Sequence, residues 1–491
     1  MYIVMVASEC APVAKVGGLG DVVLGLSREL EIRGNAVEII LPKYDCMRYD
    51  HIWGLQVTYE NLWVPWFNYR IRCTVWFGFV HGRKCFFIEP HSRERFFERG
   101  AYYGATDEHL RFAFFSKAAL EFMLKAGKRP DIIHAHDWQT ALVPVLLYEI
   151  YKFNGMENCR ACHTIHNFRH QGIVGEDVLW LTGLGRPPYY FDRGRMGDDF
   201  NPSALNFTKG ALLYSNFVTT VSPRHAWEAR HSEWGYGLGH ALYVHQNKFG
   251  GILNGIDYEM WNPETDPLIA RQYGPDDSGR GKSENKEALR ARLWLTRERK
   301  PLVAYVGRLD MQKGVPLIRH AFFYSLQRGA QFVLLGASAE LGINAEFWQL
   351  KHDHHDNPDC HLEIGYDEEL AHLIYAAADM LVVPSLFEPC GLTQMIALRY
   401  GTVPIVRWVG GLADTVFDRD YSERPTKERN GYVFHQTDNT AIESAMDRAI
   451  GLWFHYPEEF QQLVENGMRC DYSWKRPGDD YQNVYEYIRH K

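Results

Sequence analysis

The sequence predicts an α/β protein in which two domains each carry a doubly wound parallel sheet. Short apolar stretches, typical of buried strands, alternate with amphipathic helical patterns along the 491 residues. A chain of this length forms two domains or one large one. The glycine-rich segment 17–22 is similar to segment 410–415, and each lies between an expected strand and an expected helix. This similarity favours two domains of the same kind.

The elements of the first half follow from apolar spacing. An apolar run predicts a strand at 2–7. Val22, Leu26 and Leu30 recur at the spacing of one helix face, which predicts a helix at 21–33 closed by Gly34. The same patterns predict strands at 37–41 and 132–134 and a helix at 140–151.

The second half repeats this alternation. Strands are expected at 302–306, 332–335, 380–383 and 403–406, and helices at 316–327 and 368–378. Segment 262–300 is rich in Pro, Gly, Asp and charge, which predicts a long irregular excursion on the surface. We expect domains at 1–245 and 246–475, followed by a C-terminal helix at 476–491 that packs back on the first domain.

Composition argues against several classes of function. The net charge of −8 disfavours nucleic acid as a partner, since that requires a basic face. No apolar run approaches the roughly 20 residues of a membrane span, and the first apolar run is too short for a signal peptide. Nine scattered cysteines suit a reducing compartment, so we expect a cytoplasmic protein without a membrane partner. The aromatic share of 14% fits either large cores or sugar rings stacked on aromatic side chains.

Segment 380–401 is the most informative. An apolar strand at 380–383 leads into a turn that carries Glu388, and a helix is expected to begin near Gly391 and stop at Gly401. The free N–H groups of a helix start bind phosphate, whereas a carboxylate binds hydroxyls or a cation. A ligand with sugar hydroxyls and phosphates satisfies both, so the segment predicts a site for a sugar nucleotide.

Two loops at expected strand ends carry lysine, arginine and glycine. Lys15 precedes Gly17 and Gly18, whose backbone N–H groups could approach an anion or a sugar, although a purely structural turn is the alternative. Arg308 and Lys313 follow strand 302–306. Arg grips phosphate with two parallel hydrogen bonds and Lys acts as a point charge, so this pair could do the work of a magnesium ion.

Histidines and acids mark two further strand ends. In the segment His134-Ala135-His136-Asp137, the strand is expected to end, so the two histidines need not share a face, and no third metal ligand is evident. We therefore favour Asp137 as a hydroxyl-binding or electrostatic group over a metal site. His166 could bind sugar hydroxyls or place its carbonyl near a positive charge. The Asp-Arg-Asp segment at 418–420 has a metal-binding form but is expected to be surface, so no metal site is expected.

Taken together, these motifs resemble those of the glycogen and starch synthases, which are retaining, nucleotide-sugar-dependent α-1,4-glucan glucosyltransferases. The resemblance covers essentially the full length and rests on motifs in order: Lys-x-Gly-Gly-Leu at 15–19, His-Ala-His-Asp-Trp at 134–138, Ile-His-Asn at 165–167, Asn-Gly-Ile-Asp at 254–257, Gly-Arg-Leu-Asp-x-Gln-Lys-Gly at 307–314, Phe-Glu-Pro-Cys-Gly-Leu-Thr-Gln at 387–394 and Gly-Gly-Leu-Ala-Asp-Thr-Val at 410–416. It implies the GT-B fold, with two Rossmann-like domains facing across a deep cleft. Segment 44–51 is similar to cyanobacterial members.

The resemblance also implies roles for single residues. Arg308 and Lys313 would hold the diphosphate, Glu388 would bind hydroxyls of the transferred glucose, and Asp137 would face the reacting sugar or the acceptor. The other implied contacts flank the glucose, stack on the base or bind the rest of the donor: His166, Asn254, Tyr366, Lys15, Gly17, Gly18, Cys390, Gly391, Leu392 and Thr393. One departure bears on the acceptor, because His170 replaces the tyrosine of a Tyr-Gln-Gly triplet that is common in bacterial members.

The implied reaction transfers glucose from ADP-glucose to the nonreducing 4-hydroxyl of an α-1,4-glucan, with retention and without a metal or pyridoxal phosphate. The substrates would be a nucleotide sugar and glycogen, starch or a maltooligosaccharide. Two rival hypotheses are a glucan phosphorylase, which needs pyridoxal phosphate on a lysine, and a catalytically silent glucan-binding scaffold. ADP-glucose against UDP-glucose, glycogen against a starch-like product, priming and oligomeric state stay open.

Overall fold

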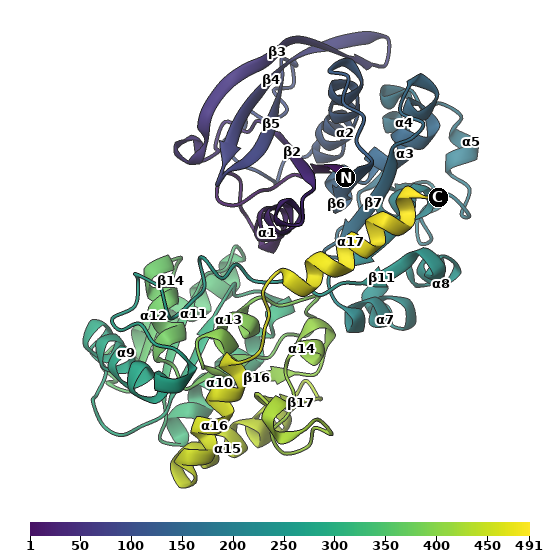
Figure 1. The fold of residues 1–491 in the computed structure, drawn as a ribbon. Helices are drawn as coiled ribbons and strands as arrows, with labels where there is room; N and C mark the ends of the chain where they lie inside the picture. Colours follow the sequence, from purple (N-terminus) through teal and green to yellow (C-terminus); the bar gives the residue numbers. More distant parts are fainter. The chain divides into compact units, whose positions relative to one another are not determined.

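The chain forms two compact units. The computed structural model describes residues 1–491; Met1–Gly255 and Trp474–Lys491 make up unit 1, and Ile256–Ser473 make up unit 2. Each unit contains a sheet of mainly parallel strands that is accompanied by helices, which confirms the predicted α/β class (Figure 1). None of the helices is long and apolar enough to cross a lipid bilayer.

The sheet of unit 1 has nine strands in the order β11-β10-β7-β6-β1-β2-β5-β4-β3. All neighbours pair in parallel except β4, which is antiparallel to both β3 and β5. The strands are β1 (Tyr2–Val6), β2 (Ala36–Pro42), β3 (Trp53–Trp66), β4 (Tyr69–Val80), β5 (Arg83–Pro90), β6 (Ile132–His136), β7 (Arg160–Ile165), β10 (Phe217–Thr220) and β11 (Phe249–Gly251). A separate small sheet pairs β8 (Ile173–Val174) with β9 (Leu205–Asn206).

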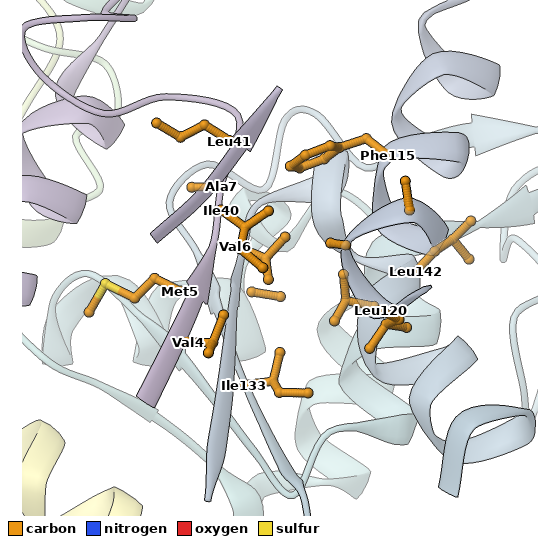
Figure 2. Packing of buried hydrophobic residues seen from close by; sticks show 14 of the residues in the cluster. Val4, Met5, Val6, Ala7, Ile40, Leu41, Phe115, Leu120, Ile133 and Leu142 are labelled. Atoms are coloured by element: carbon orange, nitrogen blue, oxygen red, sulfur yellow. The ribbon is translucent and has the colours of Figure 1, made fainter. Parts of the chain in front are cut away.

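The central strands of unit 1 are apolar because helices cover them. Val6 and Ile133 face Leu120 and Leu142, whereas Met5 points to the opposite side of the sheet (Figure 2). This alternation follows from the two-residue period of a strand. The helices of the unit are α1 (Gly18–Ile32), α2 (Glu108–Lys125), α3 (Leu142–Glu149), α4 (Asp177–Thr182), α5 (Pro187–Tyr190), α6 (Phe207–Tyr214), α7 (Pro223–His231), α8 (Gly239–Val244) and α17 (Lys475–Arg489).

The C-terminal helix α17 belongs to unit 1 although it follows unit 2 in the sequence. Its Tyr481, Tyr485 and Ile488 are fully buried. Trp474, just before the helix, lies against α1 at Gly25, where a Cβ atom would come within 2.1 Å of the indole nitrogen. Glycine at this position therefore gives the indole its place in the core of unit 1.

The sheet of unit 2 has six parallel strands in the order β14-β13-β12-β15-β16-β17. They are β12 (Leu302–Val306), β13 (Gln331–Gly336), β14 (Cys360–Ile364), β15 (Met380–Val383), β16 (Val403–Arg407) and β17 (Tyr432–Phe434). The helices are α9 (Ser278–Leu293), α10 (Val315–Gln327), α11 (Leu341–Asp353), α12 (Glu368–Ala377), α13 (Thr393–Arg399), α14 (Gly410–Thr415), α15 (Asn439–His455) and α16 (Pro457–Met468).

The prediction of an irregular surface excursion at 262–300 is wrong, because helix α9 fills its second half. Several polar residues of this segment are buried with partners. Lys282 donates hydrogen bonds to the carbonyls of Ala376 and Tyr400 and to the hydroxyl of Thr402. Burial lowers the pKa of Lys282 to about 7. Composition reports polarity but not whether tertiary partners satisfy it.

Candidate active site

In unit 2, the residues predicted to bind a donor follow the carboxyl ends of neighbouring strands. Arg308 and Lys313 follow β12, and Glu388 follows β15, which pairs with β12. Tyr366 follows β14, two strands away from β12 on the other side. This is the edge at which open α/β sheets bind ligands.

The loop after β12 presents one exposed cation and one partly buried cation. The Arg308 side chain is 67% exposed and lies 3.3 Å from the Asp310 carboxylate. Asp310 also accepts a hydrogen bond from the backbone N–H of Lys313, which fixes the short helical turn that carries the lysine. Gly314 has φ of +77°, and a Cβ there would meet the carbonyl oxygen of Pro384 at 2.3 Å, so glycine lets the two loops touch.

Glu388 is a buried carboxylate with two strong partners. Its Oε2 atom accepts hydrogen bonds from Lys313 Nζ at 2.6 Å and from Ser385 Oγ at 2.9 Å. The positive lysine compensates the charge, which allows the acid to lie 6% exposed. Both bonds end on Oε2, so Oε1 remains for a ligand.

The backbone of this loop is locked by the glycines of α14. Gly411 donates its N–H to the carbonyl of Glu388 at 3.0 Å. A Cβ at Gly410 would lie 1.9 Å from the same carbonyl oxygen, and one at Gly411 would lie 2.0 Å from that of Cys390. The glycine pair that resembles the 17–22 segment therefore allows close backbone contact with the Glu388 loop.

The expected helix after Glu388 is α13, which begins at Thr393 rather than at Gly391. Gly391 has φ of +73°, a left-handed conformation that suits glycine and turns the chain into the helix. The Gln394 amide holds the turn by donating to the carbonyls of Cys390 and Gly391. Gly391, Leu392 and Thr393 are half-buried, and the first N–H groups of a helix have no partner within it.

Tyr366 lies at the far side of this edge. Its ring is 83% exposed, and the next residue, Asp367, caps α12 by accepting a hydrogen bond from the N–H of Leu370. A large ring in this position offers a face on which a flat base can stack.

In unit 1, the loop with Lys15, Gly17 and Gly18 is organised by Glu9. The buried Glu9 carboxylate accepts hydrogen bonds from the backbone N–H groups of Val16 at 2.7 Å and Gly17 at 3.0 Å, and from the Tyr103 hydroxyl at 2.7 Å. Glu9 therefore holds the Gly17 N–H in this structure, and a role for Gly17 in binding the donor stays a prediction. Lys15 pairs with Asp21 at 2.8 Å, and Gly18 is the exposed first residue of α1.

The structure brings Asp137 and His166 together. Asp137 follows β6 with φ of +56°, and its Oδ1 accepts a hydrogen bond from the backbone N–H of His166 at 2.7 Å. Burial raises the pKa of Asp137 to about 7, although the N–H groups of His166 and Asn167 act in the opposite direction. Burial also lowers the pKa of His166 to about 3, so its ring is neutral near pH 7.

The two histidines of β6 do share a face, contrary to the sequence-based expectation. Strand β6 continues to His136, and the ring centroids of His134 and His136 are 4.1 Å apart. His136 Nδ1 lies 3.1 Å from His166 Nε2, and His134 Nδ1 lies 2.7 Å from the Tyr485 hydroxyl of α17. Through the histidines of β6, the C-terminal helix α17 is therefore connected to His166.

Asn254 follows β11 at the same edge of the unit 1 sheet. It is buried, and its Oδ1 atom has no hydrogen-bond partner. An unpaired buried amide oxygen costs free energy that a donor on a ligand, such as a sugar hydroxyl, would recover. The exposed His170 lies in the 166–172 loop, and Gln171 of that loop donates to the carbonyls of Phe168 and Tyr236.

Comparisons with known proteins identify the family of the chain. The family model described as the starch synthase catalytic domain matches residues 2–244 of the sequence. The family model described as glycosyl transferases group 1 matches residues 288–468. Glycogen synthase 1 of Trichormus variabilis is 65% identical over 492 residues, covering 100% of both chains. Probable glycogen synthase 2 of a Nostoc species is 64% identical with the same coverage.

The chain belongs to the glycogen synthase family. It is therefore a glucosyltransferase that elongates a glucan. The catalytic domain of starch synthase IV from Arabidopsis thaliana, bound to ADP and acarbose, is 45% identical with a TM-score of 0.96, covering 100% of this chain and 99% of that chain. The chain has the two-domain GT-B fold of these enzymes.

The 418–420 segment of this glycogen synthase family member is not the exposed segment predicted. Asp418 is buried, and Arg448 bonds to the carboxylates of both Asp418 and Asp420. Asp418 also accepts from the backbone N–H of Val433. The motif is an ion-pair network, and the structure contains no group of three His, Cys, Asp or Glu residues that could hold a metal ion.

Several partners of the predicted residues were not anticipated. Glu9 organises the glycine loop, Ser385 holds Glu388, and His136 contacts His166. A lone acid in an otherwise apolar stretch could have drawn attention to Glu9. Nothing in the sequence pattern pairs His136 with His166, because that contact depends on β6 lying beside β7.

Proposed function

We propose that the chain transfers glucose from ADP-glucose to the nonreducing 4-hydroxyl of an α-1,4-glucan, with retention of configuration. The observation that carries the proposal is the Lys313–Glu388 pair beside Arg308 and the start of α13, at one sheet edge. This arrangement has cations and N–H groups for a diphosphate and a carboxylate oxygen for sugar hydroxyls. The ADP bound to the Arabidopsis relative supports the choice of nucleotide.

The leaving diphosphate carries most of the charge that develops in the reaction. We assign Arg308 and Lys313 to its oxygens, because Arg forms two parallel bonds and Lys adds a point charge. The N–H groups at Thr393 and its neighbours would add dipoles of the same sign. Such fixed donors stabilise the transition state without reorganisation, which is the largest contribution in many enzymes.

The groups in the structure favour a front-face substitution over a double displacement. A retaining double displacement uses two carboxylates about 5–5.5 Å apart, one of which is a free nucleophile. Glu388 is engaged by Lys313 and Ser385, which suits binding of hydroxyls and weakens it as a nucleophile. The leaving phosphate oxygen would then take the proton of the acceptor hydroxyl, and positioning would supply much of the rate.

We assign the transferred glucose and the acceptor to the residues of unit 1. Asn254 Oδ1 and the neutral ring of His166 would bind sugar hydroxyls. Asp137, when ionised, would stabilise positive charge that develops at the sugar. Lys15 and Gly18 would contact the donor, and Tyr366 of unit 2 would stack on its base.

We propose that the enzyme needs no cofactor of its own, because the paired cations of the β12 loop provide the charge that the leaving group requires. All nine cysteines are free thiols, which supports a reducing compartment such as the cytoplasm. The partners would be the nucleotide sugar and a glycogen, starch or maltooligosaccharide acceptor.

The proposal is tested with a matrix of donors and acceptors. ADP-glucose and UDP-glucose are each supplied with glycogen, maltotriose or no acceptor, and the nucleoside diphosphate released is measured. The proposal expects glucan-dependent release of ADP and a product that α-1,4-specific hydrolysis degrades. Release that does not depend on a glucan, or exclusive use of UDP-glucose, would contradict it.

A further inference from the structure

Unit 2 has a pocket beside α14, at the carboxyl ends of β16 and β17, in addition to the candidate donor site. Its volume is about 380 Å³, and its lining includes Trp408, Phe417, Tyr421, Asp418, His435 and Arg448. None of the residues assigned above to the donor or the acceptor lines it. The pocket therefore needs an explanation of its own.

Aromatic side chains form much of the pocket wall, and two of them are open to solvent. Trp408 is 40% exposed and Tyr421 is 76% exposed. The Trp408 ring lies against His435 with centroids 5.2 Å apart, and the Arg448 guanidinium covers the Tyr421 ring at 4.7 Å. These contacts hold both rings beside the cavity, where their apolar faces can take up a flat ligand.

The charged groups of the pocket cancel one another. Arg448, the cation of the lining, is bonded to Asp418 and Asp420, and the neighbouring Arg419 is bonded to Asp420 and Glu459, so neither cation is left uncompensated. A phosphate or nucleotide would need an uncompensated cation, which this wall does not offer. The neutral polar residues Ser422, Gln436 and Ser444 also line the pocket.

This combination of aromatic faces, balanced charge and many hydrogen-bonding groups fits a neutral ligand rich in hydroxyls. Arg448 lines the pocket, and its buried Nε atom has no hydrogen-bond partner. A purely apolar ligand would leave Asp418, Arg448 and the neutral polar groups without contacts to replace water. A sugar ring has an apolar face for the aromatic side chains and hydroxyls for the polar ones.

We propose that this pocket is a second carbohydrate site, which binds a glucosyl segment of the polymer that the enzyme elongates. Helix α14 links it to Glu388. The backbone of Gly410 lies against Glu388 at one end of the helix, while Ala413 and Val416 line the pocket further along. The helix is short, about 9 Å for its six residues.

A polymer held at two points gains affinity without any new contact at the first point. Binding at the pocket raises the effective concentration of neighbouring chain ends at the reacting site. A short oligosaccharide offers far fewer glucosyl segments for the pocket than the polymer does, so it gains less. The ligand assignment rests on the chain being a glucan-elongating enzyme, but it does not depend on the roles assigned to Arg308, Lys313 or Glu388.

The test compares the double variant Trp408→Ala, Tyr421→Ala with the wild type and with Trp348→Ala. Trp348 is a matched control, because it is 49% exposed on α11 of the same unit and contacts Lys351. The first measurement is binding, read as the retardation of each protein in native gels that contain increasing glycogen. It needs no turnover, so it remains informative if the proposed reaction is wrong.

The double variant should bind glycogen roughly fivefold more weakly or worse, since truncating an aromatic anchor costs over about 1 kcal/mol. Trp348→Ala should bind as the wild type does, and Trp408→Phe, which keeps an aromatic face, should lose less than Trp408→Ala. In kinetics, the half-saturating concentration should rise more for glycogen than for maltotriose.

Two results overturn the proposal. The first is a double variant that retains wild-type affinity for glycogen in the gel. The second is an equal loss for glycogen and maltotriose, which would place the effect at the reacting site. Unchanged thermal unfolding of the variants, measured by circular dichroism, shows that a loss of binding is not a loss of fold.

Discussion

In both units the candidate site residues lie at the carboxyl edge of the sheet, but the residues of unit 2 are charged and those of unit 1 are mostly neutral. Unit 2 places ionic groups after β12 and β15 and pairs them, as in the Lys313–Glu388 contact. Unit 1 places histidines after or within β6 and β7 and keeps them neutral, because burial lowers the pKa values of His134, His136, His163 and His166. Its acid, Asp137, has a pKa raised to about 7.

Under the proposed function, this difference between the units would let one architecture serve two tasks. A departing diphosphate needs charge that stays constant with pH, and paired lysine and arginine provide it. A sugar is neutral, and neutral imidazole and amide groups bind its hydroxyls without the cost of burying a charge. Variants that remove the charged side chains of unit 2, or that change the neutral histidines of unit 1, therefore test this comparison.

The largest effect is expected from removing the cations of unit 2. Lys313→Ala should lower kcat by about 10²–10³, because one fixed stabilising donor is worth that much in comparable sites. It also leaves the buried Glu388 with Ser385 as its only partner. Arg319→Ala is a suitable control, since Arg319 lies on the exposed side of α10 and pairs with Glu346.

Steady-state release of ADP from ADP-glucose with saturating glycogen measures this effect. Arg308→Ala should behave in the same direction. Wild-type kcat in both variants would show that these cations do not hold the leaving group.

A second variant separates sugar binding from base recognition. Glu388→Gln keeps the size of the side chain but removes its charge, so both the Lys313 pair and the acceptor strength for sugar hydroxyls weaken. We expect kcat to fall by about tenfold or more, in line with the loss of a charged hydrogen bond. The fall should be equal for ADP-glucose and UDP-glucose; a change only in their ratio would place Glu388 near the base instead.

A third prediction concerns pH and unit 1. The folded-state pKa values of His163 and His166 are lowered to about 3 and that of His225 to about 4, so the unfolded chain binds more protons below its ordinary histidine pKa. Their contribution to stability is fully present above about pH 6.5 and is lost as pH falls toward 3–4. Asp137 acts oppositely: its contribution is present at low pH and is lost as pH rises through about 7.

Three histidines outweigh one aspartate, so the unfolding temperature should fall as pH drops from 6.5 to 4.5. His163→Leu removes one such group, whose two ring nitrogens have no partner, and should flatten the decline by about 1.4 kcal/mol per pH unit. His352→Gln, on the exposed side of α11, should leave the slope unchanged. Thermal unfolding followed by calorimetry across this range measures the slope, and a His163→Leu slope equal to that of the wild type would contradict the assignment.

The smallest effect on catalysis is expected at the C-terminal helix. Gly25→Ala places a methyl group where the Trp474 indole lies, so Trp474 and α17 should loosen from α1. Hydrogen exchange should speed up in α17 and in β6, because Tyr485 bonds to His134. Gly451→Ala, a glycine of α15 with open space around its Cβ position, is the control. Protection of α17 equal to the wild type would show that the indole is not its anchor.

The sequence predicted buried parallel strands well and tertiary partners poorly. Strands β12 and β15 have the predicted bounds, because a strand covered on both faces is a continuous apolar run. Strands β3 to β5 were not predicted; β3 is largely exposed and lacks such a run, whereas the buried apolar run 85–88 of β5 was overlooked. Helix α9 was missed because its buried polar residues Lys282 and Arg290 find partners on other elements.

The same division holds for the candidate site. Arg308, Lys313, Glu388 and Asp137 were predicted from residue type and position after a strand, and the role of His166 came from the resemblance. The contacts that the site residues make with Glu9, Ser385 and His136 were not predicted, because those contacts depend on the tertiary structure. The glycine loop shows the consequence, since its N–H at Gly17 is occupied by an acid from the preceding strand end.

The central claim is that Arg308 and Lys313 hold the diphosphate. Isothermal titration calorimetry of the double variant Arg308→Ala, Lys313→Ala with ADP and with adenosine tests it most directly. The account predicts at least about tenfold weaker binding of ADP, since each charged hydrogen bond is worth about 1.5–3 kcal/mol, and unchanged binding of adenosine. ADP affinity equal to the wild type, or an equal loss with adenosine, would contradict it.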